Sequence, residues 1–212
     1  MTINQHNLNT IVSATEKYNK QLIIVTKNRS PQDLDFLLKS GFRKFGENKV
    51  QEGAFKFQID IRQRFENIEL HLIGPLQSNK TEKALETFDV IQTIDRKKII
   101  DEICKIIIKP KKFLTKGYFI QVNIGEEQQK SGVTKNELHN LYKYALEKKL
   151  NIIGLMCIPP KIGSSSIYFR EMIALRDNLN SKLKLSMGMS DDYKEALSYG
   201  TDIIRVGSSI FQ

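Results

Sequence analysis

The chain has 212 residues, with 33 Lys and Arg against 24 Asp and Glu, and a formal charge of +9. Its 40% hydrophobic and 27% charged residues are typical of a globular protein with one sizeable core, and no stretch approaches the roughly 20 apolar residues of a membrane span. The lysines are spread along the chain without a nucleic-acid-binding motif, so nucleic acid is not an expected partner.

The N-terminus lacks the basic and apolar regions of a secretory signal. Cys104 and Cys157 lie in unlike contexts and have no metal-ligand spacing. Two thiols without a sign of pairing are typical of a reducing compartment, so we expect a cytoplasmic protein that binds no metal.

Short apolar runs typical of buried strands alternate with segments of helical spacing. They are LIIV (22–25), FRKF (42–45), LHLI (70–73), VIQTI (90–94), YFIQVNI (118–124), IIGLM (152–156), LKLSM (183–187) and DIIRV (202–206). Eight strands alternating with helices predict an α/β fold, a (β/α)8 TIM-type barrel, built as one domain over residues 1–212. A doubly wound open sheet is the alternative, but its Gly-rich turn after the first strand is missing.

Helix start signals support the alternation. They are Ser30 with Pro31, Asp95, Thr134 with Glu137 three residues later, and Ser190 followed by two aspartates. A full eighth helix has no room after the last strand. Residues 8–18 have helical spacing and are expected to stand in for it.

In a barrel of this kind, function lies at the carboxyl ends of the strands. Two loops of small residues follow the last two strands, SMGMS (186–190) and GSS (207–209). Exposed N–H groups beside small hydroxyl side chains make an anion site, so the pair predicts a phosphate site. Two ordinary turns are the alternative.

Lys27 ends the apolar strand LIIVTK. It either reaches solvent or is a Schiff-base lysine, whose pKa an apolar wall would lower so that the free amine attacks an aldehyde. An aldehyde cofactor that also needs a phosphate site is pyridoxal 5′-phosphate (PLP). Arg205, two residues before Gly207, would then reach the pyridine nitrogen, or would instead pair with a carboxylate such as Glu47. Spacing leaves both alternatives open.

Seven segments resemble, in order, the YggS/PROSC family of PLP homeostasis proteins, which is similar to the N-terminal barrel of alanine racemase. They are LIIVTK, FGENKVQEG, HLIGPLQSNK, QVNIGEEQQKSGV, GLMCIP, LSMGMSDDYKEAL and RVGSSIF. The resemblance covers residues 22–211, and HLIGPLQSNK and LSMGMS are its most specific segments.

The resemblance implies a PLP site with Lys27 as the covalent aldimine lysine. The other implied contacts are Asn48 at the phenolic oxygen, Arg205 at the pyridine nitrogen, and Ser190, Gly207 and Ser208 at the phosphate. The family more often has a Gly-Thr-Ala type sequence where GSS stands here, but Ser208 keeps the hydroxyl. His71 is expected to be a hydrogen-bonded barrel histidine, while His6 and His139 are expected at the surface.

An arginine at the pyridine nitrogen keeps that nitrogen largely unprotonated, which weakens the cofactor as an electron sink. Racemisation also needs a second base, which a racemase obtains from a second domain and a partner subunit. The leading hypothesis is therefore a monomeric, non-enzymatic PLP carrier that supplies PLP-requiring apo-enzymes. A small PLP-dependent racemase or lyase is the alternative, and a basic nucleic-acid-binding barrel is third.

Overall fold

The computed structural model describes residues 3–161 and 164–211. Eight parallel strands close into a barrel in which each strand pairs with the next along the chain and β8 pairs with β1. The strands are β1 Gln21–Val25, β2 Lys44–Glu47, β3 Glu69–Leu72, β4 Val90–Ile94, β5 Gly117–Val122, β6 Ile152–Cys157, β7 Lys184–Ser186 and β8 Ile203–Val206. This confirms the predicted barrel and excludes the open sheet.

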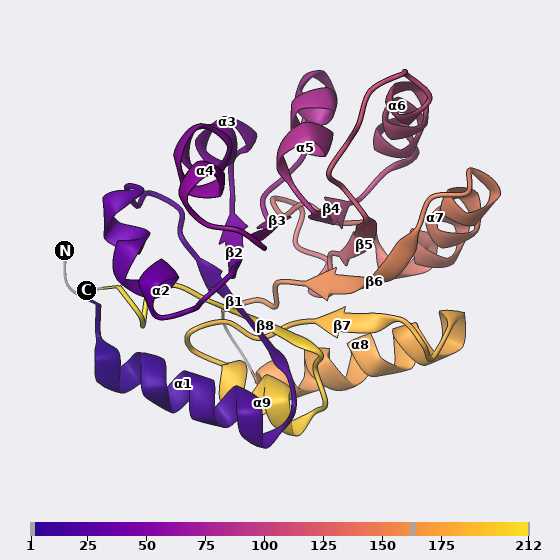
Figure 1. Ribbon diagram of the computed structural model, residues 1–212. Coiled ribbons are helices and arrows are strands. Elements are labelled where there is room, and N and C mark those ends of the chain that lie inside the picture. Colours follow the sequence, from indigo (N-terminus) through magenta and orange to yellow (C-terminus); the bar gives the residue numbers. More distant parts are fainter. Residues whose placement is uncertain (1–2, 162–163, 212) are drawn as a thin grey trace.

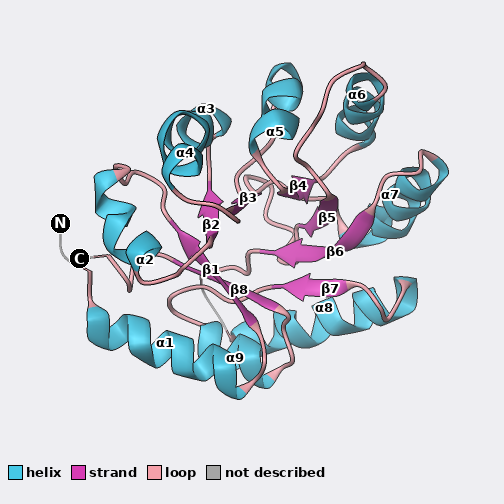
Figure 2. Ribbon diagram, in the orientation of Figure 1, coloured by secondary structure: helices cyan, strands magenta, loops and turns pink. Residues whose placement is uncertain are grey.

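Helices form a layer outside the barrel (Figures 1 and 2). The α-helices are α1 Gln5–Lys17, α2 Asp35–Lys39, α3 Val50–Gly53, α4 Arg62–Arg64, α5 Thr81–Thr87, α6 Lys97–Ile107, α7 Lys135–Glu147, α8 Ser165–Leu179 and α9 Tyr193–Ser198. A π-helix, η2 Ala54–Ile61, joins α3 to α4, and two 3₁₀ turns, η1 Gln32–Leu34 and η3 Ser78–Lys80, precede α2 and α5.

α1 lies beside α9 and β1 and takes the place of an eighth barrel helix, as the sequence predicts. The Asn7 side-chain amide donates to the carbonyl of Ser209 at 3.0 Å. The N–H of Asn4 donates to the carbonyl of Ile210 at 2.9 Å. The two ends of the described chain therefore lie side by side, and α1 holds the loop after β8.

The second strand begins two residues later than predicted, because Phe42 lies in the turn that closes α2. Gly41 adopts a φ of +91°, the left-handed conformation that ends helices. The N–H groups of Gly41 and Phe42 then donate to the carbonyls of Leu38 and Leu37, which closes the last turn of the helix.

Two predicted helix caps are right and two are wrong. Thr134 caps α7 through its hydroxyl, and Ser30 accepts from the N–H of Asp33 at 3.2 Å. Asp95 instead accepts from the side chain of Arg96, which is itself the first cap residue of α6. α9 starts after Asp192 rather than at Ser190, whose hydroxyl has a partner elsewhere.

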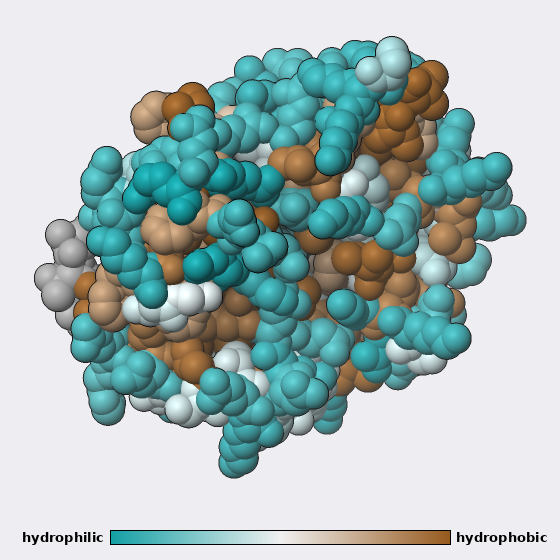
Figure 3. Space-filling view, viewed as in Figure 1, coloured by the Kyte–Doolittle hydropathy of each residue, from teal (hydrophilic) through white to brown (hydrophobic). Residues whose placement is uncertain are grey.

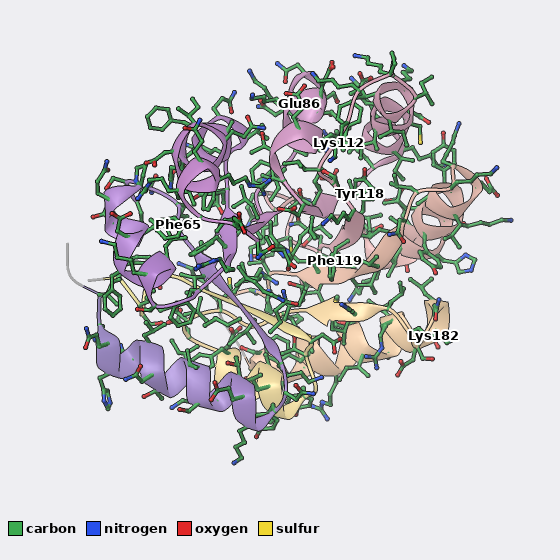
Figure 4. The ribbon with its side chains drawn as sticks, viewed as in Figure 1. Phe65, Glu86, Lys112, Tyr118, Phe119 and Lys182 are labelled. Carbon is green, nitrogen blue, oxygen red and sulfur yellow. The ribbon has the colours of Figure 1, made fainter. Side chains whose placement is uncertain are left out.

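Alternation along the strands separates two packed regions. Tyr118 of β5 packs in the outer core under the helices, whereas the next residue, Phe119, packs inside the barrel (Figure 4). The inner cluster consists of Ile23, Val90, Phe119, Met156 and Ile203. The barrel interior is therefore filled by side chains and is not a pore.

Hydrophilic side chains cover most of the face drawn in Figure 3, with smaller hydrophobic areas between them. This agrees with the high charge of the chain. Over the residues that the structure describes, none of the helices combines the length and the apolar character needed to cross a membrane.

The packing of η2 on β2 predicts unequal effects for two nearby phenylalanines. Phe57 is fully buried, with its ring 5.6 Å from that of Phe45, whereas Phe55 is 61% exposed. Phe57→Ala should lower the free energy of unfolding by about 3–5 kcal/mol. Phe55→Ala should change it by less than about 0.5 kcal/mol. Urea unfolding measures both, and equal losses would contradict this packing.

Candidate functional site

The two small-residue loops meet at the carboxyl mouth of the barrel. The Ser208 hydroxyl donates to Oγ of Ser190 at 2.8 Å, and the N–H of Ser209 donates to the same oxygen at 3.4 Å. Oγ of Ser209 is buried and has no hydrogen-bond partner among the described residues. Three hydroxyl groups and a backbone N–H from loops 18 residues apart in sequence therefore gather at one point.

Glycine is required in both loops by close approach. A Cβ on Gly207 would lie 2.8 Å from the carbonyl oxygen of Val25, so the loop after β8 packs directly on the end of β1. Gly188 has a φ of +98°, and a Cβ there would lie 2.5 Å from that of Ala196. The small residues thus let the loop after β8 pack on the backbone of β1 and the loop after β7 pack on α9.

Arg205 points into the barrel just below these loops and is only 3% exposed. Its Nη1 donates to Oγ of Ser186 at 2.7 Å and its Nη2 to the carbonyl oxygen of Cys157 at 2.8 Å. Burial lowers the pKa of Arg205 from its ordinary value. A guanidinium has five N–H donors, so these two bonds leave donors for a ligand.

The alternative pairing of Arg205 with Glu47 is wrong, because the two residues lie on opposite faces of the barrel wall. Phe45 and Glu47 of β2 face the helices, where they contact Phe57 and Lys56. By alternation Asn48, the half-buried residue after β2, follows Gly46 on the barrel side.

Lys27 lies in a turn two residues beyond the end of β1, and its side chain is exposed. β1 ends at Val25, as the predicted run 22–25 does, so Lys27 follows the strand and does not end it. Its exposed side chain does not support the apolar wall that the Schiff-base alternative expects around the amine. Lys27 is close in sequence to Val25, against which Gly207 packs. No hydrogen bond joins Lys27, Asn48 and Arg205 within the described part of the chain.

A buried lysine that no sequence pattern identifies organises this turn. Lys56 of η2 has its Nζ 2.8 Å from carboxylate oxygens of both Glu47 and Glu52, and it donates to the carbonyl oxygen of Thr26 at 2.6 Å. The Thr26 hydroxyl donates to Glu47 at 2.6 Å. Burial raises the pKa of Glu47, although Lys56 and Thr26 oppose this shift.

The same cluster fixes the backbone on both sides of Lys27. Before it, the Thr26 carbonyl accepts from Lys56; after it, the N–H of Asn28 donates to Glu52 at 2.5 Å. Asn28 has a φ of +60°, a left-handed conformation that Asn tolerates. The sequence signal for this cluster was limited to one carboxylate, Glu47, shortly after the predicted second strand.

His71 is the hydrogen-bonded barrel histidine that the sequence predicts. Its Nδ1 lies 2.8 Å from Nε2 of Gln92, and its Nε2 lies 2.8 Å from Oε1 of Glu69. The hydrogen bond from His71 lowers the pKa of Glu69 to about 2. His6 and His139 are exposed, as expected.

The donor set suits a phosphorylated aldehyde. Hydroxyl groups and a backbone N–H at the loops match phosphate oxygens, a buried guanidinium has donors for a ring nitrogen, and an exposed amine stands at the same mouth. Within residues 3–161 and 164–211, no three His, Cys, Asp or Glu side chains are grouped to hold a metal ion.

The chain is similar to proteins of known name over nearly its full length. It is 37% identical to the pyridoxal phosphate homeostasis protein of Haemophilus influenzae, over 98% of this chain and 94% of that protein. PipY of Synechococcus elongatus, solved with PLP bound, is 28% identical with a TM-score of 0.84, over 98% of this chain and 99% of that one.

Alanine racemase from Acinetobacter baumannii shares the fold, with a TM-score of 0.72 at 14% identity. The match covers 97% of this chain and 60% of the racemase. No protein-family model matches the chain.

Removal of Lys56 should destabilise the protein in a pH-dependent way. Lys56→Met leaves Glu47 buried without its partner, which should cost about 3–5 kcal/mol in the free energy of unfolding. Burial raises the native pKa of Glu47, so its contribution to stability falls as pH rises above the ordinary range of a glutamate. Without Lys56 the effect of burial on the pKa of Glu47 is less opposed. The loss in the free energy of unfolding should therefore be larger at pH 8 than at pH 5.

Urea unfolding at the two pH values measures this effect. Lys39→Met, at an exposed lysine of α2, should change the free energy of unfolding by less than about 0.5 kcal/mol. Adding Glu47→Gln to Lys56→Met should recover part of the loss. If Lys56→Met lowered the free energy of unfolding by the same amount at both pH values, the role assigned to Glu47 would be contradicted.

Proposed function

The chain belongs to the pyridoxal phosphate homeostasis protein family, and on that premise we propose that it holds PLP reversibly and takes part in regulating its supply. The observation that carries the proposal is the contact of Ser190 with Ser208 beside Gly207, at the same mouth as Lys27 and Arg205. PipY, which has nearly the same fold, was solved with PLP bound, and this supports a PLP site here.

Each side chain of the site has a distinct task in this proposal. Ser190, Gly207 and Ser208 bind the phosphate, Arg205 donates to the pyridine nitrogen, and Asn48 faces the phenolic oxygen. The Lys27 amine condenses with the aldehyde, so that a C=N bond forms and the aldehyde oxygen leaves as water. The exposed position of Lys27 gives water and other amines access to that bond, which suits release as well as capture.

A carrier explains the site better than an enzyme. Arg205 stays charged and offers a hydrogen bond, not a proton, to the ring nitrogen, which leaves PLP a weak electron sink. The relatives are named for PLP homeostasis and not for a reaction. Catalysis of amino-acid racemisation therefore has less support.

We further infer that the carrier is a cytoplasmic monomer that supplies PLP-requiring apo-enzymes. Both cysteines, Cys104 and Cys157, are free thiols, which suits a reducing compartment.

The first test concerns the attachment of PLP. The protein incubated with PLP should be yellow, and borohydride reduction followed by peptide mapping should locate the pyridoxyl group on Lys27. Lys27→Ala should lose both signals, whereas Lys130→Ala should keep them, because Lys130 bonds the carbonyl of Pro159 and an adjacent carboxylate. Label mainly on Lys80 or Lys130 would contradict the assignment.

The second test concerns the phosphate. Ser190→Ala combined with Ser208→Ala should weaken PLP binding by about 2–5 kcal/mol, because a hydrogen bond to a charged group contributes roughly 1.5–3 kcal/mol. Pyridoxal, which lacks the phosphate, should bind the variant and the unmodified protein almost equally. Fluorescence or absorbance titration gives both affinities, and equal losses for the two ligands would show that these hydroxyls do not bind phosphate.

A further inference from the structure

A single file of polar side chains crosses the barrel interior from Arg205 to the opposite mouth. Ser186 of β7 contacts Arg205, and its hydroxyl lies 2.7 Å from Oε1 of Gln92. Gln92 of β4 contacts Nδ1 of His71 at 2.8 Å, and His71 contacts Glu69 at 2.8 Å. The three middle members, from three strands, are all buried, in a barrel whose other inner residues include a cluster of five apolar side chains.

The chemistry of these groups gives the file one direction. Nε2 of Gln92 can only donate, so Nδ1 of His71 must accept and the ring proton must lie on Nε2, facing Glu69. Oε1 of Gln92 accepts from Ser186, whose oxygen in turn accepts from Arg205. Every donor therefore points away from the guanidinium and toward the carboxylate.

The file of side chains ends at Glu69, which is partly exposed to solvent. Glu69 is 37% exposed at the amino mouth, in a hollow of about 400 Å³ formed where the strands begin. The Gln21 side-chain amide also donates to Oε1 of Glu69 at 2.8 Å, and Lys44 lies 3.9 Å away. The pKa of Glu69 is lowered to about 2, chiefly by the hydrogen bond from His71, so this last acceptor stays charged even in mild acid.

One of the two acceptors that orient the Arg205 guanidinium belongs to this file of side chains. Its Nη2 is held by the Cys157 carbonyl, but its Nη1 is held only by Ser186 among the described residues. A hydroxyl rotates freely unless its own proton has an acceptor, and Gln92 supplies that acceptor. Two fixed acceptors on different strands define the plane of the guanidinium.

We propose that Ser186, Gln92, His71 and Glu69 are positioning residues that fix Arg205 in the plane in which it meets the ligand at the carboxyl mouth. The identity of that ligand as PLP rests on the proposed function. The direction of the hydrogen bonds follows from the protein's own side chains and does not depend on which ligand binds.

The first experiment uses the unmodified protein without ligand. Nitrogen-15 NMR of the three histidine rings should show His71 as the neutral tautomer with its proton on Nε2 at neutral pH, with a His71→Asn variant to assign the resonance. Gln92→Glu presents an acceptor to Nδ1 instead of a donor, and His71 should then carry a proton on Nδ1. An Nδ1–H tautomer in the unmodified protein would overturn the proposed direction.

The second experiment tests whether this file of side chains affects PLP affinity through the contact between Arg205 and the pyridine nitrogen. Gln92→Leu should weaken binding of PLP about tenfold, the effect of roughly one net hydrogen bond. Binding of 1-deazapyridoxal 5′-phosphate, which has a carbon in place of the ring nitrogen, should change less than twofold. A loss of stability alone would affect both ligands equally.

Thr93→Val is the matched control, because Thr93 is the next residue of β4, is equally buried, and its hydroxyl has no partner in the described structure. It should leave both affinities and the His71 tautomer unchanged. Equal losses for the two ligands with Gln92→Leu, or an equal effect of Thr93→Val, would overturn the positioning role. If the unmodified protein binds no PLP, the proposed function fails, while the His71 resonance still decides the direction of the file.

Discussion

The buried ammonium group of Lys56 is the interaction on which the candidate site depends. A charge removed from water is tolerated only when acceptors surround it, and here they come from the end of β1, the end of β2 and α3. A shift of either strand end would cost that charge one of its three acceptors. The turn that carries Lys27 is thereby fixed relative to the barrel, although Lys27 itself makes no such contacts.

The barrel interior is filled partly by apolar side chains and partly by polar side chains that hydrogen-bond to one another. The apolar cluster around Phe119 fills space without any need for partners, as most barrel interiors do. The Arg205 guanidinium, on the carboxyl side of this cluster, requires hydrogen-bond acceptors. Polar side chains can be buried in such an interior only if each of them has its hydrogen-bond partners. The file from Ser186 to Glu69 meets that requirement by ending on a partly exposed carboxylate.

The sequence allowed the fold to be predicted because buried parallel strands require continuous apolar runs, and eight such runs are visible. Caps with partners three residues away, such as Thr134 with Glu137, were also predicted correctly. Ser190 was misassigned as a helix start because its partner, Ser208, is distant in the chain. Gln92 and Ser186 are 94 residues apart, and Lys56 stands in a helix where a lysine ordinarily faces water, so no local pattern could identify either contact.

The contact between Asn7 and Ser209 joins residues 202 positions apart, and it supports the loop that carries Ser208. Strand pairing between β1 and β8 has a similarly long span. During synthesis, the earlier strands can pair as they emerge, but this loop cannot take shape until the chain through Phe211 has left the ribosome. The growing chain therefore has its lysine long before it has a place for a phosphate, and firm capture of the ligand must wait until the loop after β8 has emerged.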